Sequence, residues 1–142
     1  MKTVGQLLAS KPSHLISIDP NSSVYEALKL MVEKDIGSLL VLESNKLVGI
    51  FTERDYARKL VLQGKSSYDT LVGEVMSTHL TAVKTDNTLA DCMEIMTIER
   101  FRHLPVMQDG EVIGLLSIGD LVKELLTIHE ETIQQLQTYI NS

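Results

Sequence analysis

The chain has 142 residues, of which 44% are hydrophobic and 23% are charged, and its formal net charge at neutral pH is −6. This size and composition predict one globular domain, or two half-sized domains that share a core, and exclude a large enzyme. The acidic balance argues against broad binding to nucleic-acid backbones, and a single cysteine excludes an intramolecular disulfide. No apolar run reaches the roughly 20 residues of a membrane-spanning helix, so we expect a cytoplasmic protein.

The sequence repeats itself with an offset of 65 residues, without a gap, from Leu15 and Leu80 to Asp55 and Asp120. Each copy predicts a short apolar strand, a capped amphipathic helix, two strands joined by a tight turn, and a second helix. A looser match opens each copy with a short helical turn, VGQLL in the first copy and VGEVM in the second. Cys92 lies in the apolar stripe of a predicted helix, which favours a packed structural thiol over a reactive one.

We predict an α+β fold in which two tandem β-α-β-β-α repeats, residues 1–65 and 66–128, pack with quasi-twofold symmetry. Each half has roughly 60 residues, too few to bury a good core alone, so mutual packing is expected. The predicted strands, in chain order, are LISI, SLLVL and KLVGIF in the first copy and LTAV, HLPVM and EVIGLL in the second.

A C-terminal helical extension is predicted at 129–142. Its apolar stripe favours a contact within the fold or in a dimer, of which we expect the homodimer contact. It lacks the strongly basic face of a membrane-surface helix. The stripe begins after Asp120 and comprises Leu121, Val122, Leu125, Ile128, Ile133, Leu136 and Ile140.

Two similar corners, GIFTERD and GLLSIGD, end a strand and begin a helix in the two copies. One interpretation is a helix cap, in which the hydroxyl of Thr52 or Ser117 accepts an early backbone N–H and the carboxylate of Asp55 or Asp120 favours the positive helix end. The other is a ligand site, in which the carboxylate accepts hydrogen bonds from a ribose diol. The two roles are compatible.

The corners differ in charge. Arg54 lies between Thr52 and Asp55 and can reach a phosphate, whereas the second corner has Ile118 and Gly119 there. The two sites should therefore differ in affinity or in ligand.

A second basic group, ERFRHLPV, contains Arg100, Arg102 and His103. Because side chains alternate along a strand, Arg102 and His103 should face opposite sides, and the three groups should not all meet one ligand from the same face. The first copy has Gly37 and Ser38 in place of Arg102 and His103, which speaks against two symmetric phosphate sites. A solvated basic edge is the alternative for each residue.

The duplicated corners, the RHLPV strand and the gapless β-α-β-β-α repeat resemble a stand-alone tandem pair of cystathionine-β-synthase (CBS) domains, also called a Bateman module. The resemblance implies a regulatory, homodimeric module that binds an adenosine-containing ligand. AMP is the ligand we expect first, and ADP, ATP, NAD and S-adenosylmethionine are alternatives. It implies ribose contacts by Thr52, Asp55, Ser117 and Asp120, phosphate contacts by Arg54, Arg100, Arg102 and His103, and an adenine pocket at Ile16, Ile18, Thr81 and Val83.

We expect a binding module and no enzyme, because the sequence contains no nucleophile-base pair, carboxylate dyad or P-loop. No metal site is expected, because His14, His79 and His129 have no ligands at metal-binding spacing, and no catalytic cofactor is expected. The regulated partner protein is unidentified, and a membrane or nucleic-acid partner is not expected. The alternative function is a structural dimerisation module in which the corners are only caps.

Overall fold

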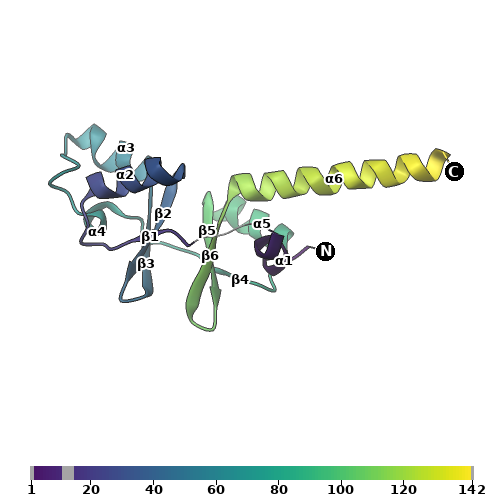
Figure 1. Cartoon of the computed structure of the whole chain (residues 1–142), viewed down its shortest axis with the longest axis horizontal. Helices are drawn as coiled ribbons and strands as arrows, with labels where there is room; N and C mark the ends of the chain where they lie inside the picture. Colours follow the sequence, from purple (N-terminus) through teal and green to yellow (C-terminus); the bar gives the residue numbers. More distant parts are fainter. Residues whose placement is uncertain (1, 11–14, 142) are drawn as a thin grey trace.

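Two three-stranded mixed sheets, one from each sequence repeat, form the centre of the structure (Figure 1). The computed structural model describes residues 2–10 and 15–141. In each sheet a short first strand runs parallel to the second, and the second is antiparallel to the third. The predicted α+β fold with two β-α-β-β-α repeats is therefore confirmed. The elements are α1 (Val4–Ser10), β1 (Ser17–Ile18), α2 (Val24–Lys34), β2 (Ser38–Glu43), β3 (Lys46–Thr52), α3 (Glu53–Lys59), η1 (Val61–Gln63), α4 (Val72–Val75), β4 (Val83–Lys84), α5 (Leu89–Glu99), β5 (His103–Gln108), β6 (Glu111–Ser117) and α6 (Ile118–Asn141).

The tight turn in each repeat is made of residue types that suit its backbone conformation. Ser44 and Asn45 have φ of 50° and 65°, and Asp109 and Gly110 have φ of 53° and 81°. Two successive residues with positive φ match the right-handed twist of the flanking strands, and Asn, Asp and Gly tolerate this conformation best. Both predicted hairpins, β2–β3 and β5–β6, form around these turns.

The first strand of each repeat is shorter than the predicted LISI and LTAV. β1 and β4 each pair with their neighbour through two residues only. Leu15, at the start of the predicted first strand, is 44% exposed. The apolar run therefore enters the sheet only at its end.

Helix α1 packs against the second repeat, although it precedes the first one in the chain. Val4 and Leu7 are buried in the core that contains α5, β5 and β6. The backbone N–H of Val4 donates to the carbonyl of Asn87 at 2.9 Å, and that of Gly5 donates to Thr85 at 2.9 Å. A Cβ on Gly5 would lie 3.2 Å from the Thr85 carbonyl oxygen, so glycine permits this close approach.

Helix α4 makes the reciprocal contact with the first repeat. Val72 and Val75 are buried in the core that contains α2, β2 and β3. The N–H of Val72 donates to Ser22 at 2.9 Å, and a Cβ on Gly73 would lie 3.1 Å from the Pro20 carbonyl oxygen. The two Val-Gly turns that the sequence placed at the start of each repeat are thus exchanged between the repeats.

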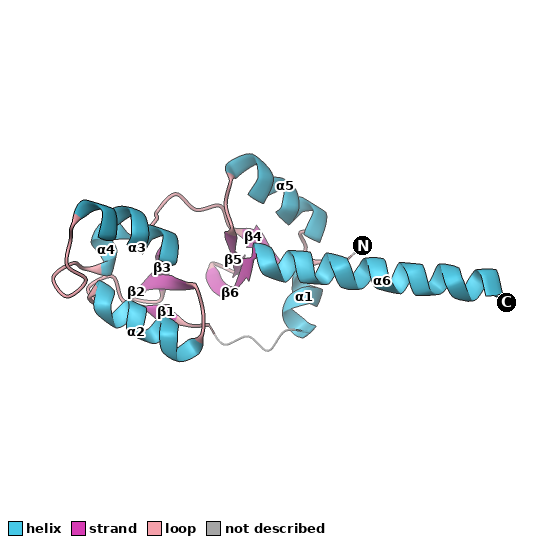
Figure 2. Ribbon diagram, turned by 90° about the horizontal axis from the view of Figure 1, so that it is seen from above, coloured by secondary structure: helices cyan, strands magenta, loops and turns pink. Residues whose placement is uncertain are grey.

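The two repeats also share an apolar cluster where their sheets meet, as seen from above in Figure 2. Leu40 and Ile50 of the first repeat pack there with Val112 of the second. Ile50 and Ser77 exchange two backbone hydrogen bonds, of 3.0 and 2.8 Å, which tie strand β3 to the segment that leads into the second repeat. The mutual packing predicted from the small size of each half is therefore present.

Cys92 is fully buried in the core of the second repeat. Burial raises the pKa of its thiol to about 11, so little thiolate exists near neutral pH. The predicted structural role of this cysteine is confirmed.

Helix α6 runs without a break from Ile118 to Asn141, so the predicted extension from residue 129 continues the last helix of the second repeat. Within the described part of the chain, no helix is long and apolar enough to cross a bilayer.

The exchange of helices makes the N-terminal turn a part of the second core. Leu7→Ala should lower the free energy of unfolding by about 2–5 kcal/mol, because it leaves a cavity beside α5 and β6. Leu62→Ala is the control, since Leu62 is 79% exposed. Urea denaturation of both variants measures the difference, and an unchanged midpoint for Leu7→Ala would contradict the packing of α1.

Candidate functional site

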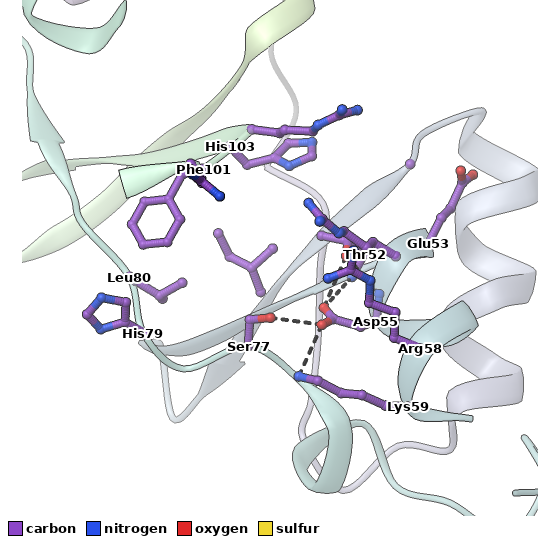
Figure 3. Close-up of a pocket in the computed structure, with 15 residues that line it drawn as sticks. Thr52, Glu53, Asp55, Arg58, Lys59, Ser77, His79, Leu80, Phe101 and His103 are labelled. Atoms are coloured by element: carbon purple, nitrogen blue, oxygen red, sulfur yellow. Dashed lines mark hydrogen bonds and ion pairs between the residues drawn. The ribbon is translucent and has the colours of Figure 1, made fainter. Parts of the chain in front are cut away.

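A cavity of about 650 Å³ lies where the first corner faces the segment that leads into strand β5 (Figure 3). Four parts of the chain line it: Gly37 just before β2, β3 with α3, the segment from residue 77 to 80 before β4, and the segment from residue 100 to 103. It therefore lies between the repeats. The lining residues are Gly37, Ile50, Thr52, Glu53, Arg54, Asp55, Arg58, Lys59, Ser77, His79, Leu80, Arg100, Phe101, Arg102 and His103.

The corner is a helix cap, as one of the two interpretations predicted. The N–H of Asp55 donates to Thr52 Oγ1 at 3.1 Å, and the N–H of Thr52 donates to Asp55 Oδ2 at 3.0 Å. This reciprocal pair satisfies backbone donors at the start of α3. Strand β3 therefore ends, and α3 begins, with both side chains held at the cavity wall.

The Asp55 carboxylate does more than cap the helix. Ser77 Oγ donates to Asp55 Oδ1 at 2.8 Å, and Lys59 Nζ lies 3.1 Å from the same oxygen. Oδ2 also accepts from the Thr52 hydroxyl at 3.1 Å. Asp55 is only 6% exposed, and four donors use the acceptor positions of its two oxygens. The carboxylate thus joins α3 to the segment between the repeats.

Positive charge dominates the cavity. The chain as a whole is acidic, yet five Lys and Arg side chains line this cavity against the two carboxylates of Glu53 and Asp55. Lys59 is already paired with Asp55 and also donates to the Val75 carbonyl at 2.9 Å. The arginines are the better anion ligands, because a guanidinium offers a planar fork of donors. They are Arg54, Arg58, Arg100 and Arg102.

Arg100, Arg102 and His103 all line the same cavity, although strand alternation predicted that Arg102 and His103 would face opposite sides. Side-chain alternation applies only within a strand, and β5 begins at His103. Arg100 ends α5 with φ of 59°, and the residues from 100 to 102 form a turn rather than a pleated strand. The turn directs consecutive groups into the same cavity.

His103 is half-buried behind these arginines. Burial lowers the pKa of its imidazole, Arg102 lowers it further, and the nearby Asp120 carboxylate opposes both effects. His103 pairs with Ser117 in the β5–β6 ladder. The histidine therefore lies between the cavity and the second corner.

An apolar wall lies at the other end of the cavity. Phe101 and Leu80 lie there with His79 (Figure 3), and Ile50 completes the lining. The rings of His79 and Phe101 make an edge-to-face contact with centroids 5.6 Å apart. The site thus has one cationic and one apolar region, as an amphipathic anion would need.

The second corner has the same backbone but different charges. The N–H of Ser117 donates to Asp120 Oδ2 at 2.9 Å, and the N–H of Asp120 donates back to Ser117 Oγ at 3.1 Å, so this corner is also a cap. At the 65-residue offset, Asp35 corresponds to Arg100 and Glu124 corresponds to Lys59. Glu124 is paired with Lys2. The charge is therefore reversed at these two positions, whereas Lys123 keeps the positive charge of Arg58.

The residues predicted to contact adenine lie elsewhere. Val83 is buried in the second core, and Ile16 and Ile18 pack against the first core. Neither these three nor Thr81, Ser117 or Asp120 lines the described cavity. Val83 is fully buried, whereas Ile16, Ile18 and Thr81 are only half-buried and lie outside the lining of this cavity.

Sequence reasoning missed several lining residues. Arg58 and Lys59 could have been found, because they follow Arg54 and Asp55 by one helical turn on α3. Ser77 and His79 carried no local signal, since only the packing of the repeats brings their segment to α3. Among the described residues no group of three His, Cys, Asp or Glu side chains could hold a metal ion, and His14 lies outside the described residues.

The contacts of Asp55 predict an effect larger than that of a cap. Asp55→Asn should lower the free energy of unfolding by about 2–4 kcal/mol, because it leaves Lys59 and Ser77 without a buried charged partner. Asp91→Asn is the matched control, since Asp91 forms the same capping box with Thr88 on α5. Chemical denaturation should show the smaller loss for Asp91→Asn, and equal losses would mean that Asp55 acts only as a cap.

The lowered pKa of His103 predicts a dependence of stability on pH. The unfolded chain takes up a proton near the ordinary histidine pKa of about 6.5, while folded His103 resists protonation until lower pH. Its contribution is therefore complete above pH 6.5 or so and is lost as the pH falls below that value. His103→Gln should flatten the pH dependence in urea titrations at about pH 7.5 and 5.5, and an unchanged slope would contradict this assignment.

Comparisons with known proteins agree with the fold. The CBS domain model matches residues 4–62 and again residues 72–127. The CBS domain-containing protein CBSX3, mitochondrial, of Arabidopsis thaliana is 41% identical over 84% of this chain, and the match spans 61% of that relative's length. Because that relative is named as mitochondrial, the cytoplasmic location expected for this chain stays a prediction.

Solved structures resemble the chain along most of its length. A CBS-domain protein from Burkholderia ambifaria is 47% identical, with a TM-score of 0.85, and the match covers 89% of this chain and 95% of that one. CBSX2, solved in complex with AMP, is 31% identical, with a TM-score of 0.73, and the match covers 91% of this chain and 99% of that one. The duplicated fold, the two matches to the family model and these relatives show that the chain belongs to the CBS domain family, as a tandem pair of CBS domains.

Proposed function

We propose that this chain is a regulatory module that binds one adenosine-containing nucleotide in the cavity between its two repeats. The observation that carries the proposal is the cavity itself, which joins a cationic region to an apolar region in an acidic protein. The solved complex of the relative CBSX2 with AMP supports the same class of ligand.

The cationic region suits the phosphates. Arg54 and Arg58 approach from α3, and Arg100 and Arg102 approach from the opposite repeat, so a phosphate group would be held from two sides. Such a cluster favours anionic nucleotides over S-adenosylmethionine, which carries a positive charge. Affinity should rise from AMP to ADP to ATP as phosphates are added.

The apolar wall suits the base. Ile50, Leu80 and Phe101 offer apolar contact. The side chain of His79 is 85% exposed, so its ring is free to stack on a base. We therefore assign adenine to this wall in place of the predicted Ile16, Ile18, Thr81 and Val83.

Ribose would lie between these two regions, next to Thr52 and Asp55. Because four donors already occupy the Asp55 carboxylate, a ribose hydroxyl must displace one of them, and Ser77 is the uncharged one whose segment links the repeats. Ligand binding would then change the tie between α3 and that segment. A ligand that favours one arrangement of the repeats in this way can regulate a partner protein.

We propose one ligand per chain. The second corner presents Asp35 and Glu124 where the first presents Arg100 and Lys59, and like charges would repel a phosphate. Ser117 and Asp120 act there as a cap. The regulated partner protein and the absence of catalysis remain predictions.

Isothermal titration calorimetry with AMP, ADP and ATP tests the proposal. We expect a stoichiometry near one per chain, and Arg58→Gln should weaken ATP binding by about 10-fold to 100-fold through the loss of a charge-assisted contact. Lys123→Gln is the matched control, because Lys123 occupies the equivalent position at the second corner and lies outside the cavity. Absence of heat with all three nucleotides, and no shift of melting temperature, would favour the structural dimerisation module.

A further inference from the structure

The four arginines of the cavity are available to a ligand. Within the described part of the chain, none of their guanidinium groups makes an ion pair or a side-chain hydrogen bond. They come from both repeats, so their charges converge on one space. The four are Arg54, Arg58, Arg100 and Arg102. The cavity therefore has a surplus of positive charge that a bound anion would balance.

The two carboxylates that line the cavity are not placed to bind one metal ion together. Asp55 is 6% exposed, and four donors already use its oxygens. The Glu53 side chain points away from Asp55 (Figure 3), and its carboxylate carbon lies 3.7 Å from the place that a Cβ on Gly37 would take. Proteins usually hold a nucleotide-bound Mg²⁺ through one or two carboxylates and the phosphates. Among the lining residues, Glu53 is the carboxylate left for such an ion.

We propose that the cavity takes its nucleotide as the metal-free polyanion and discriminates against the Mg²⁺ complex. This inference rests on the proposed function, since it concerns the chemical form of the nucleotide in the same cavity. Mg²⁺ coordinates phosphate oxygens, and the planar fork of a guanidinium binds the same oxygens. The metal and the arginines therefore compete for one set of ligand atoms.

Mg²⁺ also changes the charge balance of the bound state. Its two positive charges cancel part of the phosphate charge and would lie beside four guanidinium groups, so attraction falls and repulsion is added. Glu53 alone offers a carboxylate that could offset this repulsion. The effect should be larger for ATP than for AMP, because a single phosphate offers Mg²⁺ fewer oxygens than a triphosphate does.

The metal thus determines which nucleotide the site prefers. Without Mg²⁺, the additional phosphates of ATP strengthen its binding over that of AMP. With Mg²⁺ in excess, this advantage should shrink, whereas AMP should bind almost as before. Mg²⁺ and ATP then act on the module with a negative coupling, so its response depends on the free metal as well as on the nucleotides.

Isothermal titration calorimetry with ATP tests this proposal, once with EDTA and once with MgCl₂ in excess over the nucleotide. We expect Mg²⁺ to raise the dissociation constant of ATP on the order of 10-fold and that of AMP by less than about 2-fold. KCl matches the ionic strength of the two buffers, because screening alone weakens contacts between charges. A dissociation constant of ATP that Mg²⁺ leaves unchanged, or lowers, would overturn the proposal.

Two variants separate charge balance from direct metal binding. Arg102→Gln should weaken ATP binding in EDTA more than in MgCl₂, so the ratio of the two dissociation constants should narrow by about 2-fold or more. Arg102 is exposed, so this variant should keep the fold. Glu53→Gln should strengthen ATP binding in both buffers, because it removes a negative charge from the cavity wall. Lys123→Gln is the control outside the cavity and should keep the wild-type ratio.

The variants also identify the opposite result. If Glu53 held a nucleotide-bound Mg²⁺, Glu53→Gln would weaken ATP binding in MgCl₂ alone, and this would overturn the proposal. Binding of equal strength in both buffers would overturn the discrimination against Mg²⁺ and leave the proposed function in place. Absence of binding by ATP and AMP in both buffers would overturn the proposed function and this inference together.

Discussion

Neither repeat completes a hydrophobic core without the other, and this constraint determines most of the structure. The second core contains Val4 and Leu7 from α1, and the first contains Val72 and Val75 from α4. Each core is thus completed by a short helix that belongs, in the sequence, to the other repeat. Halves of this size bury too little surface alone, and the exchange makes the pair one folding unit. The relative position of the two repeats is therefore as well determined as either core.

That fixed relation creates the cavity. Its first wall is the capped start of α3, and its other walls come from the segment before β4 and the turn before β5. The exchange of backbone hydrogen bonds between Ile50 and Ser77 holds the linking segment beside the corner, and the Asp55 carboxylate joins the same two parts. One buried carboxylate thus connects local helix capping to contact between repeats. A ligand that competes for it would act on the interface and not only on the helix.

Duplication preserved the backbone and changed the chemistry. Both corners form reciprocal caps, and Asp35 and Arg100 end equivalent helices with nearly the same φ of 53° and 59°. Asp35 and Arg100 carry opposite charges, so the first corner faces the cationic cavity and the second corner does not. Helix α6 also changes its environment along its length, since Leu121 and Ile128 pack in the second core and the helix beyond them projects away from both sheets (Figure 1).

The sequence by itself determined the features that depend on neighbours along the chain. The Asp109-Gly110 turn, the Thr52 cap and the 65-residue repeat follow from turn chemistry, capping geometry and periodicity, and all three are present. The tertiary structure alone decided which distant residues meet. It placed Ser77 and His79 in the cavity, gathered Arg100, Arg102 and His103 beside it at a turn where alternation does not apply, and limited the packing of α6 on the second core to its first part. These outcomes depend on how the repeats pack, because contacts between residues far apart in the chain leave no periodic signal in either segment.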